Sequence, residues 1–291
     1  MTRIGPGPRP ERVTMPLTSL QRRVITASLL APAAILVVLF LPGPAFAVAL
    51  GLVLLGAGWE WSALAGLTTP ATRLAYLALL GVSLLLLQLF LPPAGRMVVL
   101  ALASLGWWLL AVGLFRLREI VPASRPDPRV LLAGLVILDT AWLAIGHLHQ
   151  ASPQGPALVL FLLLLIWTAD IAAFFTGRRW GRAKLAPVLS PGKTWAGVYG
   201  AAGGAAALGL ALGLWLGLSL PALLGALLLC LATALISVVG DLFESLLKRR
   251  RGLKDSGCLL PGHGGLLDRI DSLLAAAPFF VLGLIWLGVT P

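Results

Sequence analysis

The stretch from Ser245 to Asp271 reads SLLKRRRGLKDSGCLLPGHGGLLDRID, a polar, charged and glycine-rich segment between two apolar runs. Charged residues make up only 11% of the 291 residues, so their concentration here sets this stretch apart from the rest of the chain. Asp241, Glu244, Ser245 and Lys248 stand at positions i, i+3, i+4 and i+7. This spacing predicts that their side chains share one face of a helix that continues out of the preceding apolar run.

The helix is expected to end in a loop, because glycines and prolines between positions 252 and 265 interrupt it. Glycine amides without a side chain beside them can approach an anion closely. Asp268, Asp271 and Ser272 then follow with helical spacing, and the positive end of a helix dipole favours acidic residues at such a start. Carboxylates at two helix ends, with basic residues and open backbone between them, suit a divalent metal together with a polyphosphate.

The composition around this stretch is that of an integral membrane protein. Hydrophobic residues account for 59% of the chain, and the mean hydropathy is +0.97. Apolar runs of about 20 residues recur, which is the length that crosses ~30 Å of hydrocarbon. We therefore expect an all-α, polytopic transmembrane protein with about nine spans, and we exclude a water-soluble fold.

The basic residues predict the orientation of these spans. The expected spans cover residues 24–41, 45–64, 74–91, 97–115, 130–148, 156–175, 194–218, 221–237 and 272–289. With a cytoplasmic N-terminus, all but one of the 22 basic residues fall on the cytoplasmic side, the exception being Arg96. This asymmetry explains the net charge of +11 without nucleic acid as a partner. We expect the protein in the cytoplasmic (inner) membrane, with its polar loops and active site facing the cytoplasm.

The chain divides into three expected regions. Residues 1–23 form a basic extension rich in glycine and proline that we interpret as disordered, residues 24–155 hold about five spans, and residues 156–291 form a transmembrane region with cytoplasmic polar loops. The run Ala45-Phe46-Ala47 imitates a signal-peptide cleavage site. A retained signal anchor is favoured, because the first apolar run is longer than a typical signal core.

Several acidic residues are expected at membrane depth, where each needs a partner or a wet cavity. For Glu60 and Asp139 we expect a structural ion pair or hydrogen bond. Asp170 and Asp241 end their spans near the same surface, so they can face one cavity. Two cysteines, Cys230 and Cys258, have neither disulfide nor metal-ligand spacing.

The segment from Leu189 to Thr194, LSPGKT, ends like a nucleotide-binding P-loop. That reading fails, because Pro187 stands where the first glycine is required and no apolar strand precedes it. Instead, Thr194 is expected to cap the next helix, so that its amides and Lys193 can face a nucleotide phosphate. A basic loop that holds anionic lipid head groups is the alternative. His263 could act as a base, a metal ligand or a hydrogen-bond donor.

The polar stretch resembles the signature of phosphatidate cytidylyltransferases, also called CDP-diacylglycerol synthases. That signature runs S-x-apolar-K-R, then K-D after four residues, then P-x-H-G-G and D-R-apolar-D. Every position is matched in this sequence, by Ser245, Lys248, Arg249, Lys254, Asp255, Pro261, His263, Gly264, Gly265, Asp268, Arg269 and Asp271. Upstream pieces of the family pattern match at 170–177, 189–195 and 240–245, whereas Ala196 and Phe174 depart from it.

The resemblance implies transfer of the cytidylyl group of CTP to phosphatidate, giving CDP-diacylglycerol and pyrophosphate in phospholipid biosynthesis. It implies Mg²⁺ held by Asp241, Asp268 and Asp271, and it leaves a second, monovalent cation open. The residues implied in catalysis are Asp241, Lys248, Asp255, His263, Asp268 and Asp271. Those implied in substrate binding are Asp170, Ser190, Lys193, Thr194, Ser245, Arg249, Lys254, Gly264, Gly265 and Arg269. The expected partners are CTP, phosphatidate and membrane lipid, and the resemblance is compatible with a homodimer.

Two other functions compete with this one. A polytopic transporter of an anionic solute could use a basic loop between broken helices, but it would not need paired acids beside the basic cluster. Another CTP-dependent lipid-modifying enzyme could use the same metal and cations. A CDP-alcohol phosphotransferase is disfavoured, because its D-G-x-x-A-R run is absent from the sequence.

Overall fold

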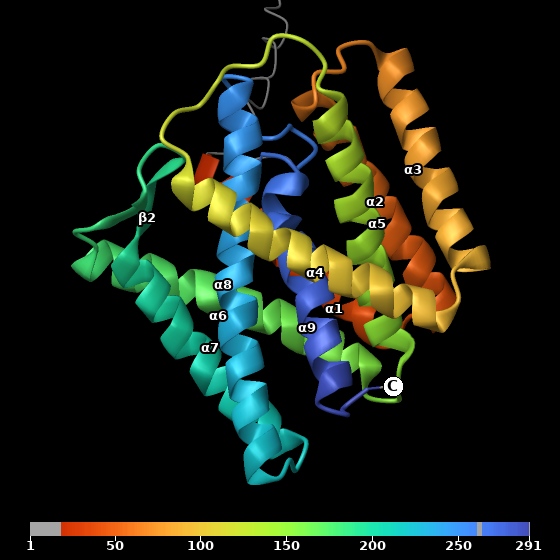
Figure 1. Ribbon diagram of the computed structural model, residues 1–291, viewed down its shortest axis with the longest axis vertical. Helices are drawn as coiled ribbons and strands as arrows, with labels where there is room; N and C mark the ends of the chain where they lie inside the picture. The colour runs from red at the N-terminus through yellow and green to blue at the C-terminus, as the bar shows by residue number, and fades with distance from the viewer. Residues whose placement is uncertain (1–18, 261–263, 291) are drawn as a thin grey trace, which may run out of the picture.

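The computed structural model describes residues 19–260 and 264–290, and within them it contains nine helices and one short hairpin (Figure 1). The helices are α1 (Ser19–Phe40), α2 (Gly43–Leu64), α3 (Pro70–Phe90), α4 (Pro93–Arg116), α5 (Pro128–Gln150), α6 (Gly155–Trp180), α7 (Trp195–Trp215), α8 (Leu220–Arg250) and α9 (Leu267–Trp286). The expectation of an all-α transmembrane protein is confirmed.

Eight of these helices, α2 to α9, are long and apolar enough to cross a membrane. In α1 the apolar part within the described side chains covers only Ser28–Phe40. The helix itself begins at Ser19, inside the segment expected to be disordered, and residues 1–18 lie outside the described part of the chain. The cytoplasmic location of the N-terminus stays a prediction.

Proline marks where many of the helices begin. The helices α2 to α6 and α8 each carry proline at the first or second helical position. Proline is tolerated there, because the amide that it lacks would have no partner within the helix. Most of these helices follow the preceding one after two to five residues, whereas eleven residues, 117–127, connect α4 to α5.

One end of the bundle gathers the polar segments, and we call the end where α8 finishes and α9 begins the polar end. Arg251 lies there, and its guanidinium donates to the carbonyl oxygens of Leu64 at 2.8 Å and Ala123 at 2.6 Å. Arg250 donates to Asp127 at 3.0 Å. Partial burial would raise the pKa of Asp127, but the hydrogen bonds from Arg250 and the Arg129 amide outweigh it and hold that pKa below its usual value. The end of α8 is thus fastened to α2 and to the loop before α5.

A two-stranded antiparallel hairpin, β1 (Lys184–Ala186) and β2 (Ser190–Thr194), precedes α7 and was not expected from the sequence. Prolines 187 and 191 prevent a helix here. Leu185 and Leu189 are buried in an apolar cluster with Leu242 of α8, so packing holds the hairpin in place. The P-loop-like segment therefore forms β2 and is placed beside α8.

The packing of α2, α3 and α5 leads to a stability prediction for Gly134→Ala. A Cβ at Gly134 would overlap the Trp61 indole nitrogen and the Tyr76 hydroxyl. These two groups donate to carbonyl oxygens of α5, at Val130 (2.7 Å) and Leu131 (3.1 Å), so they cannot retreat without losing hydrogen bonds. We expect the thermal unfolding temperature in detergent to fall, corresponding to about 1–3 kcal/mol of overpacking.

The matched control for Gly134→Ala is Gly106→Ala in α4, where an added Cβ meets nothing within 4 Å. This control should match or exceed the stability of the unaltered chain, because alanine favours a helix more than glycine does. Equal unfolding temperatures for Gly134→Ala and Gly106→Ala would contradict the close packing of the three helices.

Candidate active site

The last turns of α8 present the expected row of polar side chains on one face. Ser245 donates its hydroxyl to Asp241 Oδ1 at 3.3 Å, and Lys248 Nζ lies 3.0 Å from Glu244 Oε2. Glu244 and Lys248 are nearly inaccessible, with 3% and 12% of their side-chain surface exposed. The spacing-based prediction of one shared face is confirmed.

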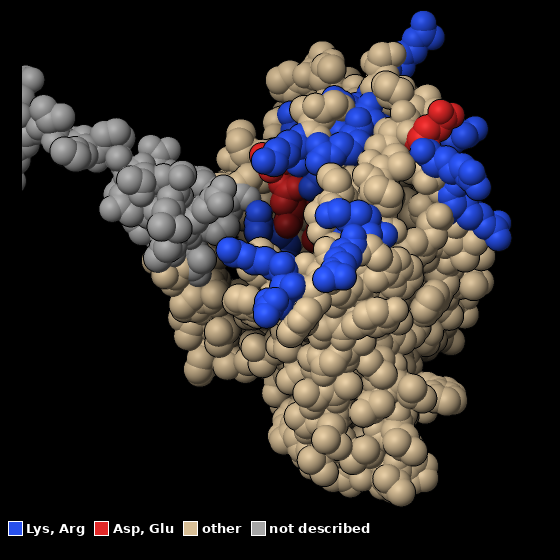
Figure 2. Space-filling view, turned by 90° about the vertical axis from the view of Figure 1, so that its left-hand side faces the viewer, with Lys and Arg blue, Asp and Glu red and all other residues tan. Residues whose placement is uncertain are grey.

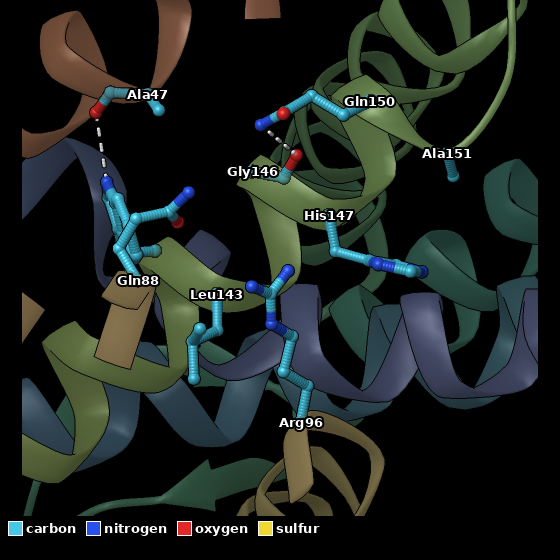
Figure 3. A pocket seen from close by; sticks show the side chains of 9 residues that line it. Ala47, Gln88, Arg96, Leu143, Gly146, His147, Gln150 and Ala151 are labelled. Carbon is cyan, nitrogen blue, oxygen red and sulfur yellow. Dashed lines mark hydrogen bonds between the residues drawn. The ribbon is translucent and has the colours of Figure 1, made fainter. Parts of the chain in front are cut away.

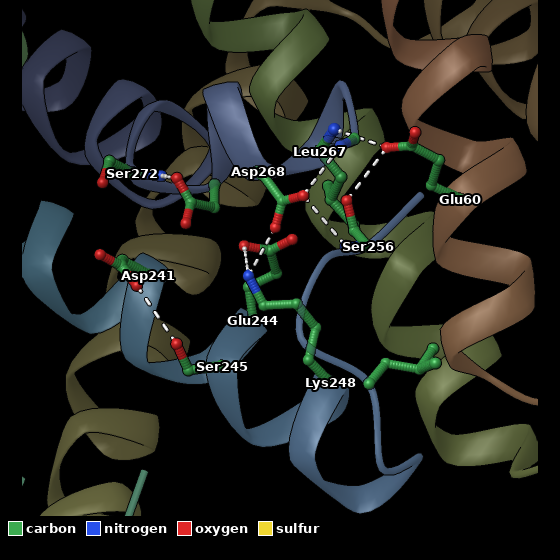
Figure 4. A network of polar contacts seen from close by, with 12 residues as sticks. Glu60, Asp241, Glu244, Ser245, Lys248, Ser256, Leu267, Asp268 and Ser272 are labelled. Atoms are coloured by element: carbon green, nitrogen blue, oxygen red, sulfur yellow. Dashed lines mark hydrogen bonds and ion pairs between the residues drawn. The ribbon is translucent and has the colours of Figure 1, made fainter. Parts of the chain in front are cut away.

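Asp268 joins this face to the start of α9 (Figure 4). Its Oδ1 accepts from Lys248 Nζ at 2.6 Å, and its Oδ2 accepts from the backbone amides of Ser256 at 3.0 Å and Gly265 at 2.9 Å. Two separate points of the intervening loop, Ser256 and Gly265, therefore converge on one carboxylate. The glycine loop is fixed at these points by charge-assisted hydrogen bonds, which are stronger than neutral ones.

Asp271 lies one helical turn after Asp268 and interacts electrostatically with Asp241 and Glu244. The two helices approach closely at this point, because a Cβ on Gly240 would overlap the Asp271 carbonyl oxygen. Glu244 Oε1 is buried and has no hydrogen-bond partner among the described residues. Three carboxylates thus gather where α8 and α9 cross.

Lys193 brings the hairpin to the same cluster. Its Nζ lies 2.6 Å from Asp241 Oδ2, and both side chains are partly exposed. Asp170 lies in the second half of α6, which continues to Trp180 and so extends beyond the expected end of this span. It interacts electrostatically with Lys193 and Asp241, so the prediction that Asp170 and Asp241 share one site is consistent with their positions. Thr194 caps α7 as expected, because its hydroxyl oxygen accepts from the Gly197 amide at 3.2 Å.

On the surface, acidic groups are visible at the bottom of a hollow that is surrounded by lysine and arginine side chains (Figure 2). The basic residues of the signature that are exposed at the polar end are Arg249, Lys254 and Arg269. Such a ring of cations around recessed carboxylates can attract a polyphosphate while leaving the acids accessible to a cation.

The remaining predicted residues occupy the edges of this cluster. Asp255 is exposed and lies against Gly264, which has a positive φ of 82° that favours glycine. Ser190 opens β2, next to the hairpin turn. His263 lies outside the described residues.

Glu60 of α2 contributes to this site, although its partners could not be identified from the sequence. Its Oε2 accepts from the Leu267 amide at 2.8 Å and from the Ser256 hydroxyl at 3.2 Å. The side chain is 2% exposed, and added Cβ atoms on Gly257 or Gly265 would overlap its carboxylate. The expected structural hydrogen bond is confirmed, and its partners are the glycine loop and the first residue of α9. Asp139 likewise accepts a hydrogen bond, from Ser83 at 3.0 Å.

These contacts make Glu60 a positioning residue, so we expect Glu60→Ala to lower turnover by about 10-fold or more. The substitution leaves the buried Leu267 amide unpaired and releases Ser256, both beside Asp268. Glu60→Gln retains an acceptor oxygen and should restore most of the lost turnover. The assay is initial rate against both substrates, and equal rates for the alanine and glutamine variants would contradict the positioning role.

Comparison with known proteins identifies the family of this chain. A model of the Cytidylyltransferase family matches residues 21–286. A phosphatidate cytidylyltransferase of Pseudomonas aeruginosa is 46% identical over 268 residues, covering 92% of this chain and 97% of the relative. Relatives with the same name from Haemophilus influenzae and Brucella suis are 39% and 35% identical, covering 90% and 91% of this chain and 97% and 93% of their own lengths. The matched region contains all of the polar cluster, and the chain belongs to the cytidylyltransferase family.

Proposed function

We propose that this protein transfers the cytidylyl group of CTP to phosphatidate, giving CDP-diacylglycerol and pyrophosphate. The observation that carries the proposal is the cluster of carboxylates recessed at the crossing of α8 and α9, with Lys193 and Lys248 within ion-pair distance. The relatives that match nine-tenths of the chain are named for this activity. The cluster lies at one end of a membrane-spanning bundle, where a lipid phosphate and a soluble nucleotide can meet.

The reaction depends mainly on cations that stabilise the negative charge of the reacting phosphates, and less on a general base. An oxygen of the phosphatidate phosphate attacks the α-phosphorus of CTP, and a new P–O bond forms. The bond from the α-phosphorus to the oxygen that bridges to the β-phosphate breaks, and pyrophosphate leaves with that electron pair. Fixed cations that face the developing charge lower the barrier. Lys193 is best placed for this role, since it is partly exposed and lies beside the carboxylates.

Lys248 and Asp268 are suited to hold the shape of the site. Lys248 is 12% exposed and bound by two carboxylates, so it keeps Glu244 and Asp268 at a fixed separation. Asp268 in turn holds the amides of Ser256 and Gly265, which fixes the glycine loop. We expect the loop amides and the exposed cations beside them to bind the phosphates of CTP.

The residues present fit a divalent cation. Four carboxylates, Asp241, Glu244, Asp268 and Asp271, share two ammonium groups, Lys193 and Lys248, which leaves negative charge uncompensated. Glu244 Oε1 is buried beside the Asp271 carboxylate and receives no hydrogen bond from a donor among the described residues, so it is a hard oxygen ligand of the kind that Mg²⁺ prefers. When bound, Mg²⁺ would supply charge neutralisation at the phosphoryl oxygens.

Among the described residues, no group of three or more His, Cys, Asp or Glu side chains is already arranged as a metal site. The free oxygens favour Asp271 and Glu244 as the holders, because both oxygens of Asp268 are engaged by Lys248 and the loop amides. Asp241 also has both oxygens engaged, by Ser245 and Lys193, so as a holder it would have to exchange one of these contacts for the cation. The assignment of Asp268 as a ligand stays a prediction, as do the second, monovalent cation and the homodimer.

We also propose that the polar end faces the cytoplasm from the inner membrane. All but one of the 22 basic residues belong to the segments expected on that side. Because CTP is a soluble nucleotide, the site must open toward the compartment that contains it.

The proposal is tested with the purified full chain, CTP, phosphatidate and Mg²⁺. We expect CDP-diacylglycerol to form, to disappear with a chelator and to return with added Mg²⁺. Glu119→Gln, an exposed carboxylate in the loop before α5, is the matched control and should keep normal turnover. Movement of an anionic solute across liposomes without product would contradict the proposal and favour a transporter.

A further inference from the structure

A second polar cavity lies at the end of the bundle opposite the candidate active site. Its volume is about 280 Å³, and it is lined by Ala47, Gln88, Arg96, Trp142, Leu143, Gly146, His147, Gln150 and Ala151 (Figure 3). These residues come from the start of α2, the end of α3, the start of α4 and the end of α5. Ala47 lies about 20 Å from Glu60 along α2, at 1.5 Å per residue, so the two sites are separate.

Arg96 gives this cavity its charge. Its Nε donates to the Leu91 carbonyl oxygen at 3.2 Å, which orients the side chain. Neither terminal nitrogen of the guanidinium donates a hydrogen bond to another group in the described part of the chain. No ion pair joins Arg96 to a carboxylate within residues 19–260 and 264–290, and the described lining residues include no Asp or Glu. Figure 3 shows the guanidinium directed between Leu143 and His147.

The other polar lining groups are suited to hydrogen bonding. Gln150 donates from Nε2 to the Gly146 carbonyl oxygen at 3.1 Å, which fixes its amide at the cavity edge. The side chains of Gln88 and His147 complete the polar wall in Figure 3. A planar guanidinium beside amide and imidazole groups, with no Asp or Glu among the described lining residues, matches an anion with several acceptor oxygens.

Apolar side chains that face outward stand next to the polar lining. Leu89 and Phe90, directly after Gln88, are 63% and 73% exposed, and Val98 on the first turns of α4 is 58% exposed. Since α3 and α4 are membrane-spanning helices, these side chains contact acyl chains. An arginine that has no carboxylate partner within the described residues and lies at the edge of the hydrocarbon is costly unless an anion or water satisfies it.

From these observations we infer that the Arg96 cavity binds the phosphate of a lipid head group in the leaflet opposite the candidate active site. The guanidinium would bind two phosphate oxygens, and the acyl chains would lie along the exposed apolar residues of α3 and α4. The cavity is at the lower limit of volumes that hold drug-sized ligands, about 300–1,000 Å³, so it suits a head group better than a whole nucleotide.

The test uses the full chain in a phosphate-free maltoside detergent, with thermal unfolding as the readout. The protein is titrated in parallel with phosphatidylglycerol, with diacylglycerol of the same chain length, and with inorganic phosphate. The variants are Arg96→Gln and Arg96→Lys, and the matched control is Arg116→Gln at the other end of α4. Lipid that binds at the candidate active site should raise the unfolding temperature of the unaltered chain and of all three variants equally. The part of the increase that is lost in the Arg96 variants therefore reports binding in the Arg96 cavity.

We expect phosphatidylglycerol to raise the unfolding temperature, and the apparent affinity to fall about 10-fold in Arg96→Gln but not in Arg116→Gln. Arg96→Lys should bind several-fold more weakly than the unaltered chain, because lysine keeps the charge and loses the planar fork. If Arg96→Gln does not fold, the comparison is made between Arg96→Lys and the unaltered chain.

Three results would overturn the inference. Equal affinity for phosphatidylglycerol in the unaltered chain and both Arg96 variants would remove Arg96 from any phosphate site. An equal Arg96-dependent shift with diacylglycerol would show that the phosphate is not recognised. An equal Arg96-dependent shift with inorganic phosphate at matched concentration would assign the cavity to a free anion rather than to a lipid.

Discussion

Asp271→Asn is expected to lower turnover at least about 100-fold, the scale seen when one charge-stabilising group is removed. The side chain lies beside Asp241 and Glu244, where it is suited to hold a divalent cation. Removing one of several neighbouring negative charges relieves repulsion, so the unfolding temperature should stay equal or rise. Activity and stability are therefore expected to change independently at this position.

The measurement for Asp271→Asn is the initial rate over a range of Mg²⁺ concentrations, together with thermal unfolding of the same preparation. Glu119→Gln provides the control for loss of a carboxylate away from the cluster. Near-normal turnover at limiting Mg²⁺ would remove Asp271 from the proposed metal site.

Asp268→Asn is expected to reduce turnover by a similar factor but also to destabilise the protein. Its carboxylate accepts from Lys248 and from the amides of Ser256 and Gly265, and the side chain is 8% exposed. An asparagine offers one acceptor oxygen instead of two and turns an N–H group toward other donors. The nearly buried ammonium of Lys248 also loses one of its two anionic partners, which is costly at such a site.

Thermal unfolding and turnover of Asp268→Asn should therefore both fall, in contrast with Asp271→Asn. The pair forms an internal comparison, because both substitutions replace one carboxylate oxygen by an NH2 group and remove one negative charge, at positions about one helical turn apart. If Asp268→Asn unfolded at the same temperature as the unaltered chain, the three contacts of Asp268 would not be what fixes the glycine loop.

The spacing of residues in the sequence was sufficient to predict the parts of the site that lie within one helix. Asp241, Ser245 and Lys248 share a face because helical periodicity requires it, and Thr194 caps α7 because its hydroxyl precedes a helical run. The apolar runs likewise predicted the spans, since their length is set by the hydrocarbon thickness. The shared helical face and the Thr194 cap depend only on residues close together in the sequence, and the lengths of the spans depend on the thickness of the membrane.

Contacts between distant segments could not be predicted in the same way. Glu60 is 196 residues from Ser256, and only the packing of α2 against the polar end brings them together. The hairpin before α7 was missed because its strands are too short to show an alternating pattern, and Leu185 and Leu189 are held by tertiary packing. Glu244 was placed on the correct face, but its proximity to Asp271 depends on how closely α8 and α9 cross at Gly240.

The fate of the CTP phosphates is the most direct test of the proposed reaction. Purified protein is incubated with phosphatidate, Mg²⁺ and CTP labelled at either the α- or the γ-phosphate, and the lipid is extracted into chloroform. Attack at the α-phosphorus predicts that α-label enters the lipid while γ-label leaves in pyrophosphate. Appearance of γ-label in the lipid would instead indicate a CTP-dependent lipid kinase, and no Mg²⁺-dependent incorporation of either label would contradict cytidylyl transfer at the carboxylate cluster.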